Sequence, residues 1–262
     1  MVEQLQDGRV LASYQGQQGT FNVLENKLFR WLCVDEEQAI QSCMCIAKPA
    51  KLNLPYQQFM MMWQLLSTEK SPHSTGLIGI GGGDIIRYLQ KNFPQMEITA
   101  VDNEPQIAKI ANEHFVIKPE QKKLTLQIEN AEQYIKQNHQ HDLLLIDVVA
   151  DSLLPDFLSK IDFWKNCHAS LNGNGIMVVN VIPESEEHFL NILEILRNVF
   201  GYIPLCVDVP EHKNIVLLVP RSEDMLPSLN MLKQRSAEQQ KTSGLPFMQC
   251  VEIIEKNNIL AD

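Results

Sequence analysis

The stretch Gly76-Leu77-Ile78-Gly79-Ile80-Gly81-Gly82-Gly83-Asp84 runs from a short apolar segment into a cluster of glycines. Segment 76–80 predicts a strand and segment 85–92 predicts a helix, so the glycines form a strand-to-helix turn. Glycine lets the backbone turn sharply and approach a ligand closely, and the start of a helix offers free N–H groups. This arrangement is typical of parallel sheets that bind a ligand at their strand ends.

The next predicted strand ends at Asp102, where nucleotide-binding folds place an acid against the ribose hydroxyls. A glycine turn alone can simply connect a strand to a helix, but the order of strand, turn, helix, strand and acid predicts a nucleoside site. Gly79, Gly81 and Gly83 are followed by Asp84, which departs from the G-x-G-x-x-G dinucleotide pattern. We therefore expect an S-adenosyl ligand, which has no pyrophosphate and whose sulfonium cation suits Asp84.

From residue 76 onward, apolar strand-like runs alternate with helical patterns. Strands are expected at 76–80, 97–101, 124–128, 143–147 and 175–181, and helices at 85–92, 105–114, 130–138, 158–171 and 185–199. Nearly continuous apolar strands separated by helices indicate a parallel sheet covered on both faces. Two further runs, 202–207 and 214–219, predict an antiparallel hairpin that closes the sheet. The predicted class is therefore α/β, with a doubly wound, mostly parallel Rossmann-like sheet of the class I methyltransferase type.

The segments on either side of this alternating region differ from it. Residues 1–55 contain short β-prone runs at 20–25, 28–34 and 40–46, which predict a small antiparallel β domain. Residues 56–221 form the predicted nucleoside-binding domain, which opens with a helical pattern at 56–67. Residues 222–262 form a polar tail with two expected helices, one from about residue 223 and one after Pro246.

The composition narrows the possible functions. The 262 residues include 22 basic and 32 acidic ones, a formal net charge of −10, which disfavours nucleic-acid binding and attracts a cationic substrate. No apolar run has the length of a membrane span, so we expect a cytoplasmic protein without a membrane partner. Six scattered cysteines and seven dispersed histidines lack ligand spacing, which predicts reduced thiols and no metal site.

Polar residues follow two more of the predicted strands. Asn130 comes after strand 124–128, where related folds place an acid or amide near the adenine amine, although a helix N-cap would use the same residue. Asp147 ends the apolar run 143–147, and Asp151 follows after a short loop. A residue at the end of a strand can also cap the loop that follows it. Both ligand and structural readings therefore remain open for these positions.

At these positions the chain resembles the spermidine synthase (polyamine aminopropyltransferase) family, over roughly residues 10–220. The matching segments are Gly81-Gly82-Gly83-Asp84, Val101-Asp102-Asn103-Glu104, Asn130-Ala131 and the run Asp142 to Asp151. The resemblance implies transfer of an aminopropyl group from decarboxylated S-adenosylmethionine to an amine such as putrescine, with Asp147 as the catalytic aspartate. It also implies a homodimer and no tightly bound cofactor. The implied donor-binding residues are Gly79, Gly81, Gly83, Asp84, Asp102, Asn130 and Ala131, and the implied acceptor-binding residues are Asp151, Tyr56 and Gln57.

The acceptor motif departs from the family pattern. The family's Y-H-E motif is Tyr56-Gln57-Gln58 here, and the spacing from Asp147 to Asp151 is one residue longer than in the family. Two alternatives therefore stay open: an S-adenosylmethionine-dependent methyltransferase, and a non-catalytic relative that binds a nucleoside or a protein partner. The retained Asp147 and the acidic net charge favour aminopropyl transfer, because an ammonium acceptor must lose a proton before its nitrogen can attack.

Overall fold

The computed structural model describes residues 5, 7–17, 19–35, 39–67, 71–118, 123–137, 139–148 and 155–257. The chain divides into two compact units. Unit 1 comprises Met1–Leu54 and Gly79–Ala131, and unit 2 comprises Pro55–Ile78 and Glu132–Asp262. The three-part division at residues 55 and 221 stays a prediction.

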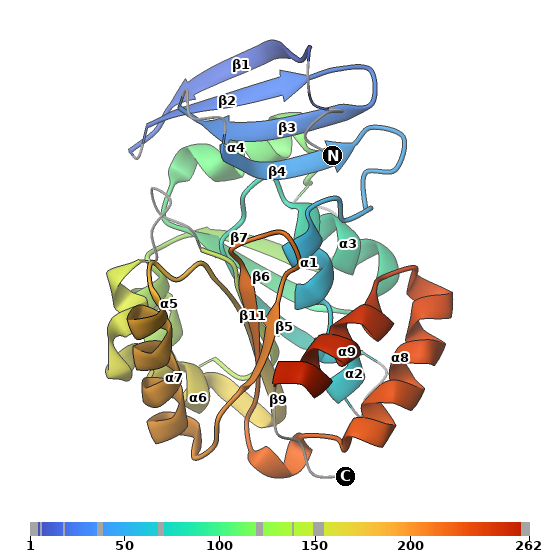
Figure 1. Ribbon diagram of the computed structural model, residues 1–262. Coiled ribbons are helices and arrows are strands. Elements are labelled where there is room, and N and C mark those ends of the chain that lie inside the picture. Colours follow the sequence, from blue (N-terminus) through green and yellow to red (C-terminus); the bar gives the residue numbers. More distant parts are fainter. Residues whose placement is uncertain are drawn as a thin grey trace. The chain divides into compact units, whose positions relative to one another are not determined.

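Unit 1 begins with a four-stranded antiparallel sheet, drawn in blue in Figure 1. Its strands, in sheet order, are β1 (Arg9–Gln15), β2 (Thr20–Glu25), β3 (Phe29–Val34) and β4 (Ala39–Cys45). The three predicted β runs are confirmed, and β1 is an additional strand that pairs with β2. Val23 and Leu32 are fully buried and directly paired, which gives the sheet an apolar face.

The remainder of unit 1 alternates between helix and strand. Its elements are α3 (Asp84–Asn92), β6 (Glu97–Asp102), α4 (Pro105–His114) and β7 (Leu124–Ile128), and β6 and β7 pair in parallel. Helix α4 begins at Pro105, whose fixed φ suits the first helical position, and the Glu104 carboxylate accepts the Gln106 N–H at 3.0 Å as its cap. Each element lies within two residues of its predicted range.

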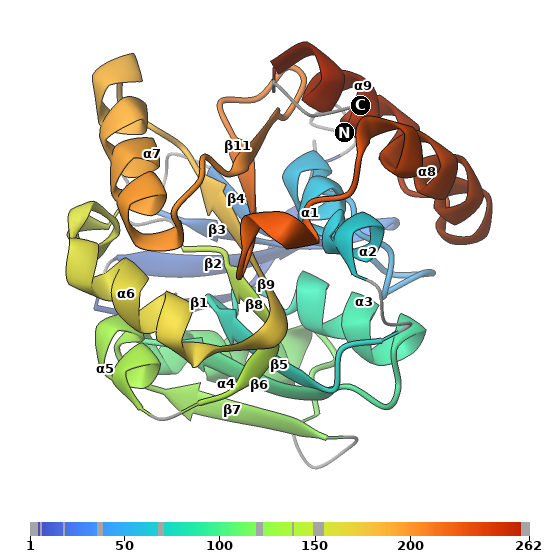
Figure 2. The ribbon, with the colours of Figure 1, turned by 90° about the horizontal axis from the view of Figure 1, so that it is seen from below.

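The rest of the chain supplies most of the central sheet and its helices. Its elements are α1 (Pro55–Met60), α2 (Trp63–Leu66), β5 (Ser74–Ile78), α5 (Ala131–Lys136), β8 (His141–Ile146), the 3₁₀ helix η2 (Asp156–Ser159), α6 (Ile161–Ser170), β9 (Leu171–Val181), α7 (Glu186–Phe200), β10 (Leu205–Asp208), β11 (Ile215–Pro220), the 3₁₀ helix η3 (Glu223–Met225), α8 (Leu229–Ser243) and α9 (Phe247–Asn257). In unit 2, α6 and α7 lie on one side of β9 and β11, and α1, α2 and α8 lie on the other (Figure 2).

The seven-stranded sheet has the order β10-β11-β9-β8-β5-β6-β7. Strand β8 pairs in parallel with both β5 and β9, whereas β11 pairs antiparallel with β9 and β10. Residues 143–146 of β8 are fully buried, as expected for a strand covered on both faces. The predicted α/β class, with its antiparallel hairpin and its small N-terminal sheet, is confirmed.

Three helix predictions need correction. The tail helix expected from about residue 223 begins only at Leu229, after the short 3₁₀ helix η3. The pattern at 56–67 is not one helix: α1 ends at Met60, and the Met61 and Met62 N–H groups bond back to Gln58 and Phe59 in tight turns before α2 begins. The helix predicted at 158–171 is split into η2 and α6. All six cysteines are free thiols. Among the described residues, no helix combines the length and apolarity needed to cross a membrane.

Candidate functional site

The glycine turn of unit 1 connects residue 79 to the start of α3. Gly79, Gly81 and Gly83 have φ angles of 96°, 51° and 76°, in the region that only glycine adopts without strain. A Cβ atom on Gly82 would lie 2.4 Å from the Ser42 hydroxyl, so this position has no room for a side chain. The local geometry thus accounts for all four glycines before any ligand is considered.

Asp102 holds this turn in place. Its carboxylate accepts the Ile80 N–H at 2.9 Å and the Glu104 N–H at 3.0 Å, and it also bonds to the backbone of Gly81. Burial raises the pKa of the Asp102 carboxyl, and these backbone hydrogen bonds oppose that rise. The carboxylate that is predicted to contact the ribose therefore already holds the backbone of the turn through hydrogen bonds.

A second acid, Glu104, lies beside Asp102 and was not among the predicted site residues. Glu104 is only 3% exposed, and its carboxylate accepts the Gln17 N–H at 2.6 Å in addition to capping α4. Its proximity contributes to the raised pKa of Asp102. The sequence indicated Glu104, because the segment Val101-Asp102-Asn103-Glu104 has two acids two residues apart at a strand end, where both side chains can lie on the same side of the chain.

Asp84, the first residue of α3, is buried against β4. Its Oδ2 atom accepts the Ser42 hydroxyl at 2.5 Å and the Cys43 N–H at 2.9 Å, and its Oδ1 atom pairs with Arg87. The Asp84 side chain is 1% exposed. Its predicted role beside the sulfonium stays a prediction, and the structure adds a second role, in which Asp84 joins the glycine turn to the N-terminal sheet.

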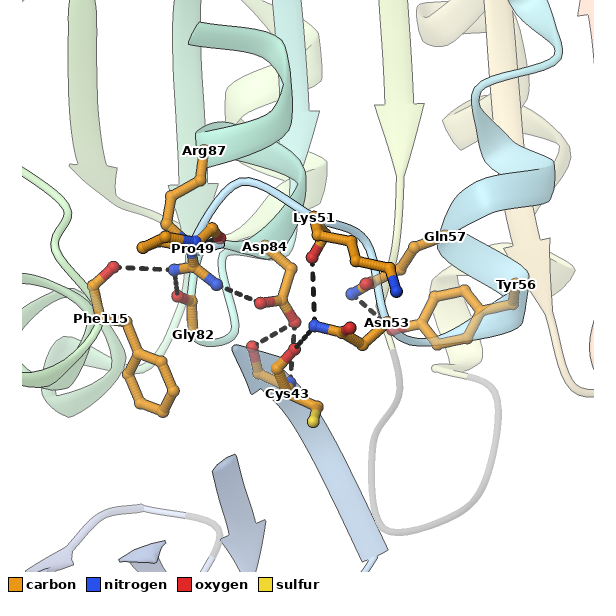
Figure 3. A network of polar contacts seen from close by, with 11 residues as sticks. Cys43, Pro49, Lys51, Asn53, Tyr56, Gln57, Gly82, Asp84, Arg87 and Phe115 are labelled. Carbon is orange, nitrogen blue, oxygen red and sulfur yellow. Dashed lines mark hydrogen bonds and ion pairs between the residues drawn. The ribbon is translucent and has the colours of Figure 1, made fainter. Parts of the chain in front are cut away.

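Arg87 is the residue around which this part of unit 1 is organised (Figure 3). Its guanidinium donates to the Pro49, Gly82 and Phe115 carbonyl oxygens and pairs with Asp84. Burial lowers the pKa of Arg87, and the Asp84 carboxylate opposes that shift. Arg87 was not predicted, although its position three residues after Asp84 in a helix is the spacing of a side-chain pair.

The last two predicted donor residues follow β7. Asn130 is exposed and directly precedes α5, and Ala131 is the buried first residue of that helix. The structure therefore places Gly79, Gly81, Gly83, Asp84, Asp102, Asn130 and Ala131 together in unit 1.

Asp147, the predicted base, lies at the end of β8 in unit 2. Its N–H donates to the Ile78 carbonyl at 2.8 Å, which continues the pairing of β8 with β5 beyond the strand. Its Oδ2 atom accepts the Tyr56 hydroxyl at 3.2 Å, and its Oδ1 atom accepts the Asn180 amide at 2.9 Å. Both carboxylate oxygens therefore have a neutral donor.

The predicted acceptor residues Tyr56 and Gln57 lie in the first turn of α1, next to each other and near Asp147. The Gln57 amide donates to the Tyr56 hydroxyl at 3.4 Å, and Gln57 is only 3% exposed (Figure 3). The structure thus places Tyr56 in contact with Asp147, and Gln57 in contact with Tyr56. Asp151 lies outside the described residues.

Two asparagines extend this network and were missed in the sequence. Asn180 of β9 donates to Asp147, and Asn214, just before β11, donates to the Asn180 Oδ1 atom at 2.9 Å. Both are buried. Asn180 could have been found as the polar residue inside the apolar run 175–181. Asn214 gave no such signal, because its loop has the composition of an ordinary polar turn.

The two groups of residues have different chemical capacities. In unit 1, a glycine turn and two strand-end acids offer backbone N–H groups and carboxylates suited to a polar nucleoside. In unit 2, a carboxylate held by a phenol and an amide can orient an ammonium group and accept its proton. Within the described residues, no group of three or more histidine, cysteine or acidic side chains could hold a metal ion.

The amino-acid sequence is similar to those of polyamine aminopropyltransferases. The relative from Neisseria meningitidis is 29% identical over 220 residues, which cover 84% of this chain and 83% of the relative. The relative from Chromobacterium violaceum is 26% identical over 222 residues, which cover 84% of each chain. No protein-family model matches the chain. The predicted resemblance to this family is confirmed.

Solved structures share the fold. A probable spermidine synthase from Corynebacterium glutamicum superposes with a TM-score of 0.76 at 17% identity, covering 97% of both chains. Human methyltransferase-like protein 13 in complex with SAH superposes with a TM-score of 0.64 at 17% identity, covering 80% of this chain and 96% of that one. At these identities the likeness establishes the fold that aminopropyl and methyl transferases have in common.

Proposed function

We propose that this chain is an aminopropyltransferase that uses decarboxylated S-adenosylmethionine as donor and a small amine as acceptor. The observation that carries the proposal is the environment of Asp147, a strand-end carboxylate whose oxygens accept hydrogen bonds from Tyr56 and Asn180. The names of the relatives, polyamine aminopropyltransferases, support the same reaction. In this proposal the glycine turn, Asp102, Asn130 and the adjoining residues of unit 1 bind the donor, which is a co-substrate and not a tightly bound cofactor.

The proposed chemistry is a displacement at carbon. The acceptor amine is protonated at neutral pH, so Asp147 orients the ammonium group and takes its proton. The nitrogen lone pair then forms a bond to the carbon next to the sulfonium, and the carbon–sulfur bond breaks with its electrons going to sulfur. General-base help of this kind contributes a factor on the order of 10²–10⁴, and positioning of the two reactants supplies much of the rest.

The test compares Asp147→Asn with Asp162→Asn, a matched change at an exposed aspartate of α6. Each protein is assayed with the decarboxylated donor and with putrescine, cadaverine and spermidine, and the products are identified by mass. We expect Asp147→Asn to lower kcat at least about a hundredfold while the affinity for 5′-methylthioadenosine is unchanged, because the amide cannot accept the proton. Wild-type protein that gives no aminopropyl product with any of the three amines refutes the proposal.

Methyl transfer is the second candidate, supported by the fold shared with methyltransferase-like protein 13. Calorimetric titration with S-adenosylmethionine and with its decarboxylated form separates the two, because a methyltransferase prefers the donor that carries the carboxylate. Tight nucleoside binding without any product supports the non-catalytic reading. We also propose a cytoplasmic homodimer, which sedimentation analysis of the full chain tests.

A further inference from the structure

Three polar side chains lie in a row across the ends of three neighbouring strands of unit 2. Asp147 follows β8, Asn180 lies in β9 and Asn214 precedes β11, and these strands are adjacent in the sheet order β11-β9-β8. The parallel register pairs Ile146 with Val179, so Asp147 and Asn180 are the next residues along the two strands. The register of the sheet therefore places Asp147 beside Asn180, and Asn214 joins them from the end of the loop between β10 and β11.

The hydrogen bonds of this row have one direction. The Asn214 Nδ2 atom donates to the Asn180 Oδ1 atom at 2.9 Å, and the Asn180 Nδ2 atom donates to the Asp147 Oδ1 atom at 2.9 Å. An amide has one accepting and one donating end, so the bond from Asn214 determines which end Asn180 turns toward Asp147. A flipped Asn180 amide would place its oxygen against the carboxylate, which is repulsive.

Burial makes this arrangement rigid. Asn180 is 1% exposed and Asn214 is 8% exposed. A buried amide that loses its partner is costly, so the two asparagines hold each other. Asn214 is itself anchored, because its carbonyl accepts the Val209 N–H at 2.9 Å within the loop between β10 and β11. Through Asn214, the β10–β11 hairpin at the edge of the sheet thus determines the orientation of the Asn180 amide, which donates to Asp147.

We propose that Asn180 is a positioning residue for Asp147 and that Asn214 orients the Asn180 amide for this task. The inference deepens the proposed function and rests on it wherever turnover is measured. Asn180 fixes the Oδ1 atom and Tyr56 fixes the Oδ2 atom, so the plane of the carboxylate is held from both sides. Tyr56 of α1 is a titratable group in contact with Asp147. A fixed plane aims the basic lone pairs of Asp147 in a constant direction.

The first test measures the Asp147 carboxyl directly, without substrate. The full-length protein is labelled with carbon-13 in its aspartate carboxyl groups, and the Asp147 signal is identified as the one absent from Asp147→Asn. We expect Asn180→Ala to raise the pKa of Asp147 by about one unit, because a hydrogen bond to the charged form is lost. Asn257→Ala is the matched control, since Asn257 donates to the exposed Asp208 at 2.7 Å in the same unit.

Two more variants keep the test decisive if Asn180→Ala does not fold. Asn180→Asp keeps the shape but places a second carboxylate against Asp147, so one of the two must titrate well above its ordinary range. Asn214→Ala leaves Asn180 in place without its orienting partner, and its effect on the pKa of Asp147 should have the same sign as that of Asn180→Ala and be smaller. An Asp147 titration unchanged in the Asn180 variants that fold overturns the proposal.

The second test uses turnover. In Asn180→Ala, kcat should fall about 10- to 100-fold, with a smaller change in the KM for the amine, and the acid limb of the kcat profile should move to higher pH. A purely structural asparagine would lower thermal stability without moving that limb. If the wild-type protein transfers no aminopropyl group, the proposed function is wrong, and the carboxyl titration still decides whether Asn180 positions Asp147.

Discussion

Removal of the Arg87 guanidinium should destabilise unit 1 far more than removal of an ordinary surface charge. In Arg87→Met, the buried Asp84 carboxylate loses its counter-ion, and the Pro49, Gly82 and Phe115 carbonyls lose a donor. Breaking a buried ion pair from one side typically costs about 3–5 kcal/mol, and each lost hydrogen bond contributes about 1 kcal/mol, part of which is already included in that cost. We therefore expect the free energy of unfolding to fall by about 4 kcal/mol, a large share of a typical domain's stability.

The assay is urea denaturation at pH 7, followed by circular dichroism, for Arg87→Met, Asp84→Asn and the double variant. Asp84→Asn should cost less than Arg87→Met, because Arg87 keeps three carbonyl acceptors. The double variant should be more stable than the sum of the single losses predicts, by at least about 1 kcal/mol, since it removes both charges together. Lys165→Met is the control, because the exposed pair Asp162–Lys165 has the same i,i+3 spacing and should contribute less than about 0.5 kcal/mol.

Two results would refute this reasoning. A loss below about 1 kcal/mol in Arg87→Met would mean that water replaces the guanidinium at no great cost, so the site is not dry. Strict additivity in the double variant would mean that Asp84 and Arg87 do not interact energetically, despite their contact.

Two further predictions concern stability. Burial lowers the pKa of His141 to about 4, so the folded state holds this ring neutral while the unfolded state binds a proton below about pH 6.5. The free energy of unfolding should therefore fall as the pH drops from about 6.5 to 4. In urea titrations at several pH values, His141→Gln should make the free energy of unfolding depend less on pH. Val116 has a φ of 60° and is 54% exposed, so Val116→Gly should relieve left-handed strain without loss of packing. We expect the free energy of unfolding to rise by about 1 kcal/mol. An unchanged or lower value from urea denaturation would contradict this account.

The sequence predicted the elements whose pattern is local. The strands of the central sheet are short apolar runs bounded by glycine or polar residues, and their order with the helices predicts the parallel sheet without any long-range information. The glycine turn was recognisable for the same reason, because its left-handed φ angles demand glycine in the sequence itself. Strand-end residues such as Asp102 and Asp147 followed from the sheet, since their position is fixed once the strands are known.

The prediction of a single helix at 56–67 failed because its residues are buried on more than one side. The helical pattern at 56–67 assumed one apolar face, but Met60, Met61, Met62 and Trp63 are all at most 1% exposed. Four consecutive buried residues cannot lie on one face of a helix, so the break between α1 and α2 follows from packing that the periodicity does not encode. Strand β1 was missed because its burial pattern alternates only weakly and none of its residues is fully buried.

The missed polar residues depend on partners far away in the sequence. Arg87 bonds to carbonyls 38 and 28 residues away, at Pro49 and Phe115, and Asn180 bonds to residues 33 and 34 positions away. A sequence pattern shows the polar type at such a position, but the partner is determined only when the sheet has formed. Arg87 and Asn180 were therefore visible as exceptions to the apolar pattern, whereas their roles were not.

The internal contacts of the glycine-turn motif change what its presence means for function. Asp102 accepts N–H groups of the turn backbone, and Asp84 accepts a hydroxyl and an N–H from β4, so both acids stabilise unit 1 in the absence of any nucleoside. A chain that had lost its ligand would still need these residues for folding. Asp147 differs, because the hydrogen bonds described for its carboxyl oxygens come from side chains of Tyr56 and Asn180 rather than from a turn that needs it. Asp147 and its two donors therefore support the proposed chemistry more strongly than the glycine motif does, although that motif first suggested a nucleoside site in the sequence.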